Sequence, residues 1–290
     1  MYLINPGFVS IGNKLGKETL FEYIKKFGFG SKTGVDLNGE STGILFSLDK
    51  VGPVELATTS FGQGVSVTPI QQITAVSAAI NGGTLYKPYI VKSINEPETN
   101  TVVKENKPTP VRKVISESTS KKVRYALESV VTNGTGRTAF IDGYRVGGKT
   151  GTAQKVKDGR YMVGNYIVSF IGFMPADDPE IVVYVAVDNA KGVTQYGGTI
   201  AGPIARNILL DAIDILKIKK PTGASEKKYN YNDLKYYQVP SVVGLEIKEA
   251  IKLLKEFKVE YTGTGDKVIY QSPEAGTRLQ EGSIVRLLTG

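Results

Sequence analysis

Apolar residues recur with the period of a helix face in several stretches of the chain. Residues 68–83 show this most clearly, because Thr68 can act as an N-cap, Pro69 suits the first helical position and Asn81-Gly82 ends the pattern. We therefore predict a buried helix, whose apolar face consists of Ile70, Ile73, Val76, Ala79 and Ile80. Further amphipathic helices are predicted over residues 14–30, 116–136 and 202–216.

Two β-rich runs lie within residues 166–188 and are joined by the turn-forming residues 175–179. They predict an antiparallel hairpin. Because helices precede this hairpin and another helix follows it, the pattern favours an α+β fold, with an antiparallel sheet flanked by helices.

The apolar periodicity stops near residue 217, where lysines far outnumber acidic residues. We interpret residues 219–237 as a basic inter-domain linker, either a solvated tether or an anion-binding arm. This divides the chain into a large domain over residues 1–218 and a small one over residues 238–290. The small domain combines short strands with one helix, on which Ile247, Ile251 and Leu254 align.

The composition narrows the chemistry that the chain can perform. It has no cysteine and no histidine, which removes disulfides, most metal sites and any Ser-His-Asp triad. We expect neither a metal nor a cofactor, and a general base would have to be a lysine, a tyrosine or a carboxylate. The net charge of +8 leaves nucleic acid, anionic envelope polymers and membrane headgroups open as partners.

No apolar run of the sequence is long enough to span a bilayer, and residues 1–10 lack the features of a signal peptide. We therefore expect a chain that carries neither a membrane anchor nor an export signal.

Residues 143–154, GYRVGGKTGTAQ, fit two unrelated patterns. One is the phosphate-loop pattern G-x-x-x-x-G-K-[ST], and the other is the K-T-G triad of serine enzymes that bind penicillin. A phosphate loop joins a buried strand to a long helix, whereas turn and strand residues follow this segment. The flanking residues therefore argue against nucleotide binding.

As a strand, residues 146–155 would let a peptide or lactam lie against small residues and share main-chain hydrogen bonds. Lys149 would then stand near a substrate carboxylate, with Thr150 and Thr152 as hydroxyl donors. On this triad alone, a glycine-rich edge strand with an ordinary surface lysine is an equally open interpretation.

Longer stretches resemble a known family. Residues 54–83, VELATTSFGQGVSVTPIQQITAVSAAINGG, followed by VGGKTGTAQ at 146–154, closely resemble the transpeptidase domain of class B penicillin-binding proteins. Residues 239–254, VPSVVGLEIKEAIKLL, and 271–287, QSPEAGTRLQEGSIVRL, resemble a PASTA module, a small β-α-β-β unit. The resemblance implies an incomplete domain of the penicillin-binding transpeptidase and β-lactamase fold, followed by a PASTA domain.

The resemblance also implies an activity, that of a serine D,D-transpeptidase that cross-links peptidoglycan. The serine of an S-x-x-K motif attacks the D-Ala-D-Ala carbonyl in such enzymes, and S-x-N and K-T-G motifs line the cleft. By this resemblance Lys149, Thr150 and Gly151 form the K-T-G motif, and the main-chain N–H of Thr152 belongs to the oxyanion hole. The implied substrate-binding positions are Gly148, Thr150, Thr152 and Gln154.

The chain departs from the family at the other motifs. S-x-x-K occurs from Ser47, Ser118 and Ser225, and none of these matches begins a buried helix upstream of S-x-N. The segment NPGFVSIGNKLG resembles the residues after S-x-N, so Asn5 would be a remnant of that motif and Leu3 would occupy its serine position. We therefore expect the nucleophilic serine to be absent and the chain to be the C-terminal part of a penicillin-binding protein, inactive alone.

The partners implied by the family are stem peptides ending in D-Ala-D-Ala and β-lactams, in cross-linking of the cell wall or spore cortex. PASTA would contact a muropeptide or a partner in division or sporulation. We expect no nucleic acid, and membrane contact only through an N-terminal anchor that this sequence lacks. The family lies outside the cytoplasmic membrane, whereas a chain expressed from Met1 would stay in the cytoplasm. Alternatives are a non-catalytic cell-wall or muropeptide binding protein, acting through PASTA, and a chain that completes the active site of another polypeptide.

Overall fold

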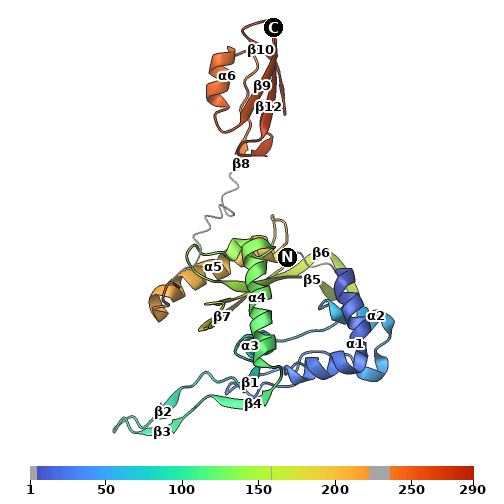
Figure 1. The fold of residues 1–290 in the computed structure, drawn as a ribbon, viewed down its shortest axis with the longest axis vertical. Helices are drawn as coiled ribbons and strands as arrows, with labels where there is room; N and C mark the ends of the chain where they lie inside the picture. The colour runs from blue at the N-terminus through green and yellow to red at the C-terminus, as the bar shows by residue number, and fades with distance from the viewer. Residues whose placement is uncertain (1–4, 158, 222–235) are drawn as a thin grey trace. The chain divides into compact units, whose positions relative to one another are not determined.

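The computed structural model of the chain describes residues 5–157, 159–221 and 236–290. It divides into two compact units, residues 1–228 and 229–290 (Figure 1). Most of the predicted linker, residues 219–237, lies outside the described residues. Among the residues that are described, no helix is long and apolar enough to cross a membrane, and no group of three or more His, Cys, Asp or Glu side chains could hold a metal ion.

Two helices of the first unit begin at the caps that the sequence predicts. Helix α3 spans Pro69–Ile80, and the side chains of Thr68 and Gln71 each accept a hydrogen bond from the backbone N–H of the other, which forms a capping box. Helix α4 spans Glu117–Asn133, and the Ser116 hydroxyl accepts from a backbone N–H of its first turn. The predicted starts of both helices are confirmed.

The other two predicted helices begin earlier than the periodicity indicates. Helix α1 spans Asn5–Lys26, is kinked at Gly16 and packs against helix α2, Pro53–Ser60. Helix α5 spans Gly197–Leu216. Glycines near the first residues of α1 and α5 lower the helix propensity there, so the sequence pattern places both starts too late. In the fold, packing against neighbouring elements outweighs the cost of these glycines.

The most buried face of α3 differs from the one that its apolar residues predict. Ile80 is fully buried, but the other predicted face residues, Ile70, Ile73, Val76 and Ala79, are only half-buried. Gln71 is instead buried, and its Nε2 donates to Ser31 O at 2.8 Å and to Thr42 O at 2.9 Å. The helix has neighbours on several sides, so one apolar stripe does not define its core face.

The main sheet has three antiparallel strands in the order β5-β6-β7. These strands are β5, Gly147–Lys157, β6, Arg160–Met174, and β7, Ile181–Asp188. The predicted hairpin is confirmed as β6 and β7, and the predicted strand over residues 146–155 is confirmed as β5. Helix α5 packs along β6 and β7, and α4 packs against β5 (Figure 1).

A hydrophobic core joins this sheet to the helices that cover it. Its buried members are Val131, Ala139, Ile141, Val146, Phe170, Met174, Val183, Ala201, Ala205, Leu209, Ala212 and Ile218. Because residues of α4, β6, β7 and α5 share one core with Val146, which directly precedes β5, the start of β5 is coupled to the packing of both helices.

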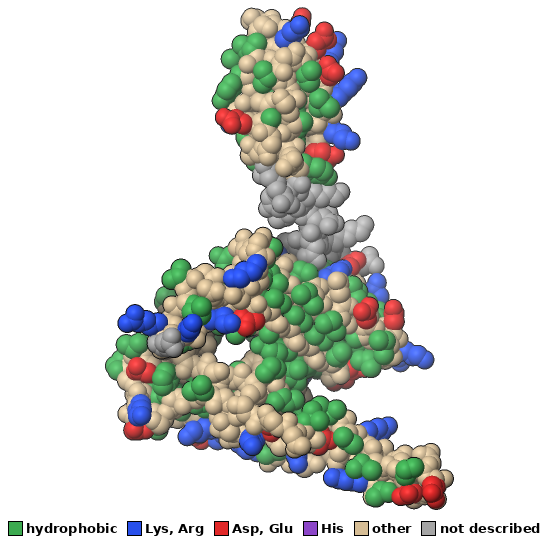
Figure 2. Space-filling model, turned by 180° about the vertical axis from the view of Figure 1, so that it is seen from behind, with side chains coloured by type: hydrophobic (Ala, Val, Ile, Leu, Met, Phe, Trp, Pro, Cys, Tyr) green, Lys and Arg blue, Asp and Glu red, His purple; other side chains and the backbone are tan. Residues whose placement is uncertain are grey.

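A β-arm extends from the first unit, as Figures 1 and 2 show. Its strands are β1, Thr84–Lys87, paired with β4, Thr109–Lys113, and β2, Ser93–Asn95, paired with β3, Val102–Glu105. All residues of β2, β3 and β4 are exposed. The Asp36 carboxylate anchors the arm by accepting the backbone N–H groups of Ile90 at 2.8 Å and Val91 at 2.9 Å.

The second unit is built on a sheet in the order β10-β12-β9, in which β9 and β12 are parallel. Its elements are β8, Tyr236–Gln238, α6, Ile247–Leu253, β9, Lys258–Gly263, β10, Val268–Ser272, β11, Arg278–Gln280, and β12, Ile284–Thr289. The predicted helix face is wrong at Ile251, which is 42% exposed. Ala250 and Leu254 are fully buried, so Ile251 lies just outside the stripe that they define.

Candidate active site

Strand β5 is an edge strand of the main sheet within the described residues, and it carries the K-T-G segment. Gly148 pairs with Gly172 of β6, and Thr150 pairs with Phe170. A Cβ atom at Gly148 would lie 2.7 Å from Ile171 O and would overlap the Phe170 ring, so only glycine allows this approach. The segment is therefore held tightly against β6, while no other strand of the described residues pairs with the second edge of β5.

Lys149 lies half-buried on β5. Its Nζ donates to Thr150 O at 2.5 Å and approaches Thr150 Oγ1 at 3.3 Å. Burial lowers the pKa of the Lys149 amine below its ordinary value, because the charged form loses water. The site thus holds a partly desolvated cation, whose attraction for an anionic ligand is stronger than that of a fully solvated lysine.

Two hydroxyl groups of β5 meet neighbouring elements of the fold. Thr150 Oγ1 lies 3.0 Å from Thr135 Oγ1, in the loop after α4. Thr152 Oγ1 accepts the backbone N–H of Gly197, the first residue of α5, at 3.2 Å. Through these two threonines, which share one face of β5, the K-T-G segment is bonded to both the α4 loop and the start of α5.

Glycines at the start of α5 make this contact possible. A Cβ at Gly197 would overlap the carbonyl oxygens of Ser169 and Gly151, and one at Gly198 would crowd Thr135 O. Helix and strand backbones thus approach directly, which side chains would prevent. Neither Thr135 nor Gly197 follows from a sequence motif, and their one local signal is the flanking glycines in the stretches NGTGR and QYGGT.

An ion-pair cluster fixes the chain just before β5. Arg145 binds Glu128 of α4 through two hydrogen bonds, of 2.8 Å and 2.6 Å, and its Nη1 lies 3.0 Å from Asp177. The hydrogen bonds to Glu128 raise the pKa of Arg145 further above its ordinary value, so it stays charged. A planar guanidinium that spans two carboxylates ties α4 to the β6–β7 turn.

The remaining predicted site residues are less closely connected. Gln154 lies on β5, half-buried, opposite Tyr166 of β6. Asn5 is exposed at the start of α1, a helix that packs mainly against α2, and Leu3 lies outside the described residues. Lys149 and Thr152 thus lie on one strand, and within the described residues no hydrogen bond joins Asn5 to either of them.

Two of the three S-x-x-K matches lie among the described residues. Ser47 and Lys50 are exposed, at the N-cap and the last residue of a 3-10 helix, Leu48–Lys50. Ser118 is exposed in the first turn of α4, with its Oγ 3.0 Å from the Ser116 hydroxyl. The third match, from Ser225, lies outside the described residues.

The structure also bears on the phosphate-loop pattern. The segment that spells it lies within an antiparallel strand, and no helix begins at Thr150. The expectation that this is not a phosphate loop is confirmed, because the pattern needs a helix N-terminus to hold the phosphates.

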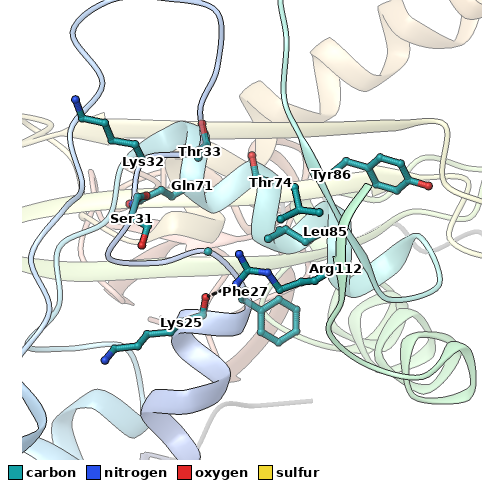
Figure 3. A pocket seen from close by; sticks show the side chains of 12 residues that line it. Lys25, Phe27, Ser31, Lys32, Thr33, Gln71, Thr74, Leu85, Tyr86 and Arg112 are labelled. Atoms are coloured by element: carbon teal, nitrogen blue, oxygen red, sulfur yellow. Dashed lines mark hydrogen bonds between the residues drawn. The ribbon is translucent and has the colours of Figure 1, made fainter. Parts of the chain in front are cut away.

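A separate pocket of about 90 Å³ lies away from the K-T-G segment, near the end of α1 and the start of the β-arm (Figure 3). Arg112 Nη1 crosses it to donate to Lys25 O at 3.3 Å, and the buried hydroxyl of Thr74 has no partner within the described residues. None of the residues of β5 lines this pocket.

Known families and proteins are similar to most of this chain. The family model of the penicillin binding protein transpeptidase domain matches residues 2–210, and that of the PASTA domain matches residues 237–290. Stage V sporulation protein D of Bacillus subtilis (strain 168) is 62% identical over 283 residues, which are 98% of this chain and 44% of that protein. The probable peptidoglycan D,D-transpeptidase PenA of Neisseria meningitidis (Z2491) is 32% identical over 227 residues, 77% of this chain and 37% of that protein.

Among solved structures, penicillin binding protein 3 of Mycobacterium tuberculosis complexed with ampicillin is similar, with a TM-score of 0.69 and 30% identity over 76% of this chain and 51% of that one. The matched region of this chain spans less than half the length of each of the two curated relatives, the Bacillus subtilis and Neisseria meningitidis proteins. The expected resemblance is confirmed for both the transpeptidase domain and the PASTA domain.

Proposed function

The chain belongs to the penicillin-binding protein transpeptidase family and carries a PASTA domain, and from that membership we propose that it is part of a peptidoglycan D,D-transpeptidase. The observation that carries the proposal is the joint placement of a desolvated lysine and two threonine hydroxyls on the glycine-rich edge strand β5. Such a strand can bind an extended peptide through its main chain, with the lysine attracting a carboxylate.

The residues of β5 take distinct roles in this proposal. Lys149 attracts the terminal carboxylate of a stem peptide ending in D-Ala-D-Ala, and Thr150 donates a hydrogen bond to it. Gly148 and Gly151 let the peptide lie close to the strand, and the backbone N–H of Thr152 stabilises the oxyanion. Gln154 extends the binding edge, and Asn5 is proposed as the remnant of the S-x-N motif.

We further propose that the chain alone lacks the nucleophilic serine of the family. Acyl transfer by this family's chemistry requires a serine activated beside a lysine. The two S-x-x-K serines among the described residues are exposed. Ser47 is the N-cap of a 3-10 helix, and Ser118 lies in the first turn of α4. We therefore infer that the chain supplies one wall of the cleft and that the serine belongs to the part of the relatives that the chain does not match.

The biological setting follows from the relatives. The 62% identity to a stage V sporulation protein supports a role in cell-wall synthesis during sporulation. The ampicillin complex of a similar structure supports β-lactams as ligands of the completed site. We place the completed protein outside the cytoplasmic membrane, where peptidoglycan is cross-linked.

The test joins to this chain the segment of the Bacillus subtilis relative that precedes the matched region. Fluorescent penicillin should form no adduct with the chain alone, by intact-mass measurement, and should acylate the joined protein. Lys149→Ala in the joined protein should slow acylation by about a hundredfold or more, because the carboxylate of the ligand loses its cation. Lys155→Ala is the matched control, since Lys155 lies farther along β5 and pairs with Asp188 at 2.7 Å.

Two results would count against the proposal. An adduct on a serine of the chain alone would show that a nucleophile is present, and equal acylation of the Lys149→Ala and Lys155→Ala proteins would remove β5 from the site. A second candidate function is muropeptide binding by the PASTA unit, whose sheet exposes the paired Tyr270 and Leu288. Amide shifts of these residues with soluble muropeptide, together with no acylation of any version, would favour that candidate.

A further inference from the structure

The Thr135 hydroxyl is held at the K-T-G segment by a rigid loop. The backbone N–H groups of Gly134 and Gly136, on either side, both donate to Val130 O, at 3.1 Å and 3.0 Å. Both glycines are buried, and a Cβ at Gly136 would lie 3.2 Å from Val130 O and 3.3 Å from the Phe170 ring. The loop therefore has little freedom to move Thr135 away from Thr150.

The hydrogen bonds of Thr150 determine where its proton points. A hydroxyl has one proton to donate and two lone pairs that accept. Lys149 Nζ lies 3.3 Å from Thr150 Oγ1, and a protonated amine can only donate. The remaining neighbour is Thr135 Oγ1 at 3.0 Å, which can either donate to Thr150 or accept from it.

We propose that Thr135 is a positioning residue that donates to Thr150 Oγ1 and so leaves the Thr150 proton for a carboxylate ligand. With both lone pairs of Thr150 engaged by Lys149 and Thr135, its own O–H turns towards the open edge of β5. If Thr150 instead donated to Thr135, the Thr150 oxygen would present a lone pair to the anionic ligand, and the two would repel each other. The inference rests on the proposed function, in which this edge binds a peptide carboxylate.

The experiment titrates the 290-residue chain with N-acetyl-D-Ala-D-Ala and, separately, with its C-terminal amide, following the backbone amide signals of Gly151 and Thr152 by NMR. Thr135→Val keeps the shape of the side chain and removes the hydroxyl. It should weaken binding of the carboxylate peptide about three- to tenfold, the effect of one hydrogen bond, and leave the amide peptide unchanged. Thr135→Ser should restore the affinity.

Thr132→Val is the matched control, because the Thr132 hydroxyl donates to Glu128 O within α4 at 3.1 Å. It should leave both affinities unchanged. Equal carboxylate affinity in the Thr135→Val variant and the unsubstituted chain would overturn the role of Thr135 and leave the proposed function standing. Equal weakening of both peptides would also overturn it, since that indicates a structural role. Failure of the unsubstituted chain to bind the carboxylate peptide would overturn this inference, whereas acylation of the joined protein decides the proposed function separately.

Discussion

Lys149 is the side chain whose ionisation matters most to the candidate site. Its amine is half-buried beside two oxygens of Thr150, and burial lowers its pKa. A carbonyl oxygen stabilises the ammonium only in part, because it carries no full charge. Lys149 is therefore poised to gain a stronger partner when an anion binds at the edge of β5.

The lowered pKa of Lys149 predicts a titration that NMR of its Nζ can follow. The pKa in the folded chain should lie below that of the same lysine in denaturant. Because the unfolded chain then binds more protons, the free energy of unfolding should rise with pH between the folded-state pKa and the ordinary value, relative to Lys149→Met. A folded-state pKa at or above the denatured one would contradict the burial of this amine.

Sequence motifs could predict Lys149 and its two threonine neighbours, because the K-T-G triad joins residue types of one chemical role. They could not predict Thr135. A threonine between two glycines is typical of a turn after a helix, and its contact with Thr150 spans 15 positions of the chain and depends on how α4 packs on β5. Such a partner follows from tertiary packing and leaves no local pattern.

At the scale of elements, the start of α5 is a close contact between a helix and strand β5. The Gly197 N–H donates to Thr152, and the Cα of this residue faces backbone oxygens of β5 and β6. The contact fixes the position of Thr152 relative to the first turn of α5. Any residue with a Cβ must push α5 outward and shift the backbone that the proposed oxyanion hole uses.

Gly197→Ala tests that contact. Alanine raises helix propensity, yet the variant should lose about 1–3 kcal/mol of unfolding free energy through overpacking against Ser169 O and Gly151 O. Urea denaturation measures the loss, and the amide signal of Thr152 should shift. Gly7→Ala in α1 is the control, because nothing lies within 4 Å of the added Cβ, and its stability should be unchanged or slightly higher.

The elements that sequence could predict are those with local signals. Caps and period define α3 and α4, and the turn residues between β-rich runs define the β6–β7 hairpin. The start of α5 was missed because a glycine pair usually marks a helix end, and here it serves close packing. The β-arm gives the sequence little beyond a strand-like stretch at residues 93–95, because its short, exposed strands lack the alternation of a half-buried sheet.

At the scale of the whole chain, each unit has a hydrophobic core of its own. The core of the first unit joins α4 and α5 to the main sheet, and that of the second consists of Val239, Val242, Ala250, Leu254, Phe257, Val268, Val285 and Leu287. No member of either cluster belongs to the other unit. We therefore expect two separate cooperative unfolding transitions, with the smaller unit limited by its small core.

Two adjacent leucines at the end of α6 make that expectation testable. Leu254 is fully buried, and Leu254→Ala should cost about 2–5 kcal/mol, enough to unfold most of a unit of this size. Leu253 is 50% exposed, so Leu253→Ala should leave the unit folded. NMR spectra of the full chain should show Leu254→Ala abolishing the dispersed signals of residues 236–290 and sparing those of β5. Loss of the β5 signals as well would mean that the two units fold as one, and equal spectra of the two variants would contradict the packing of α6 on its sheet.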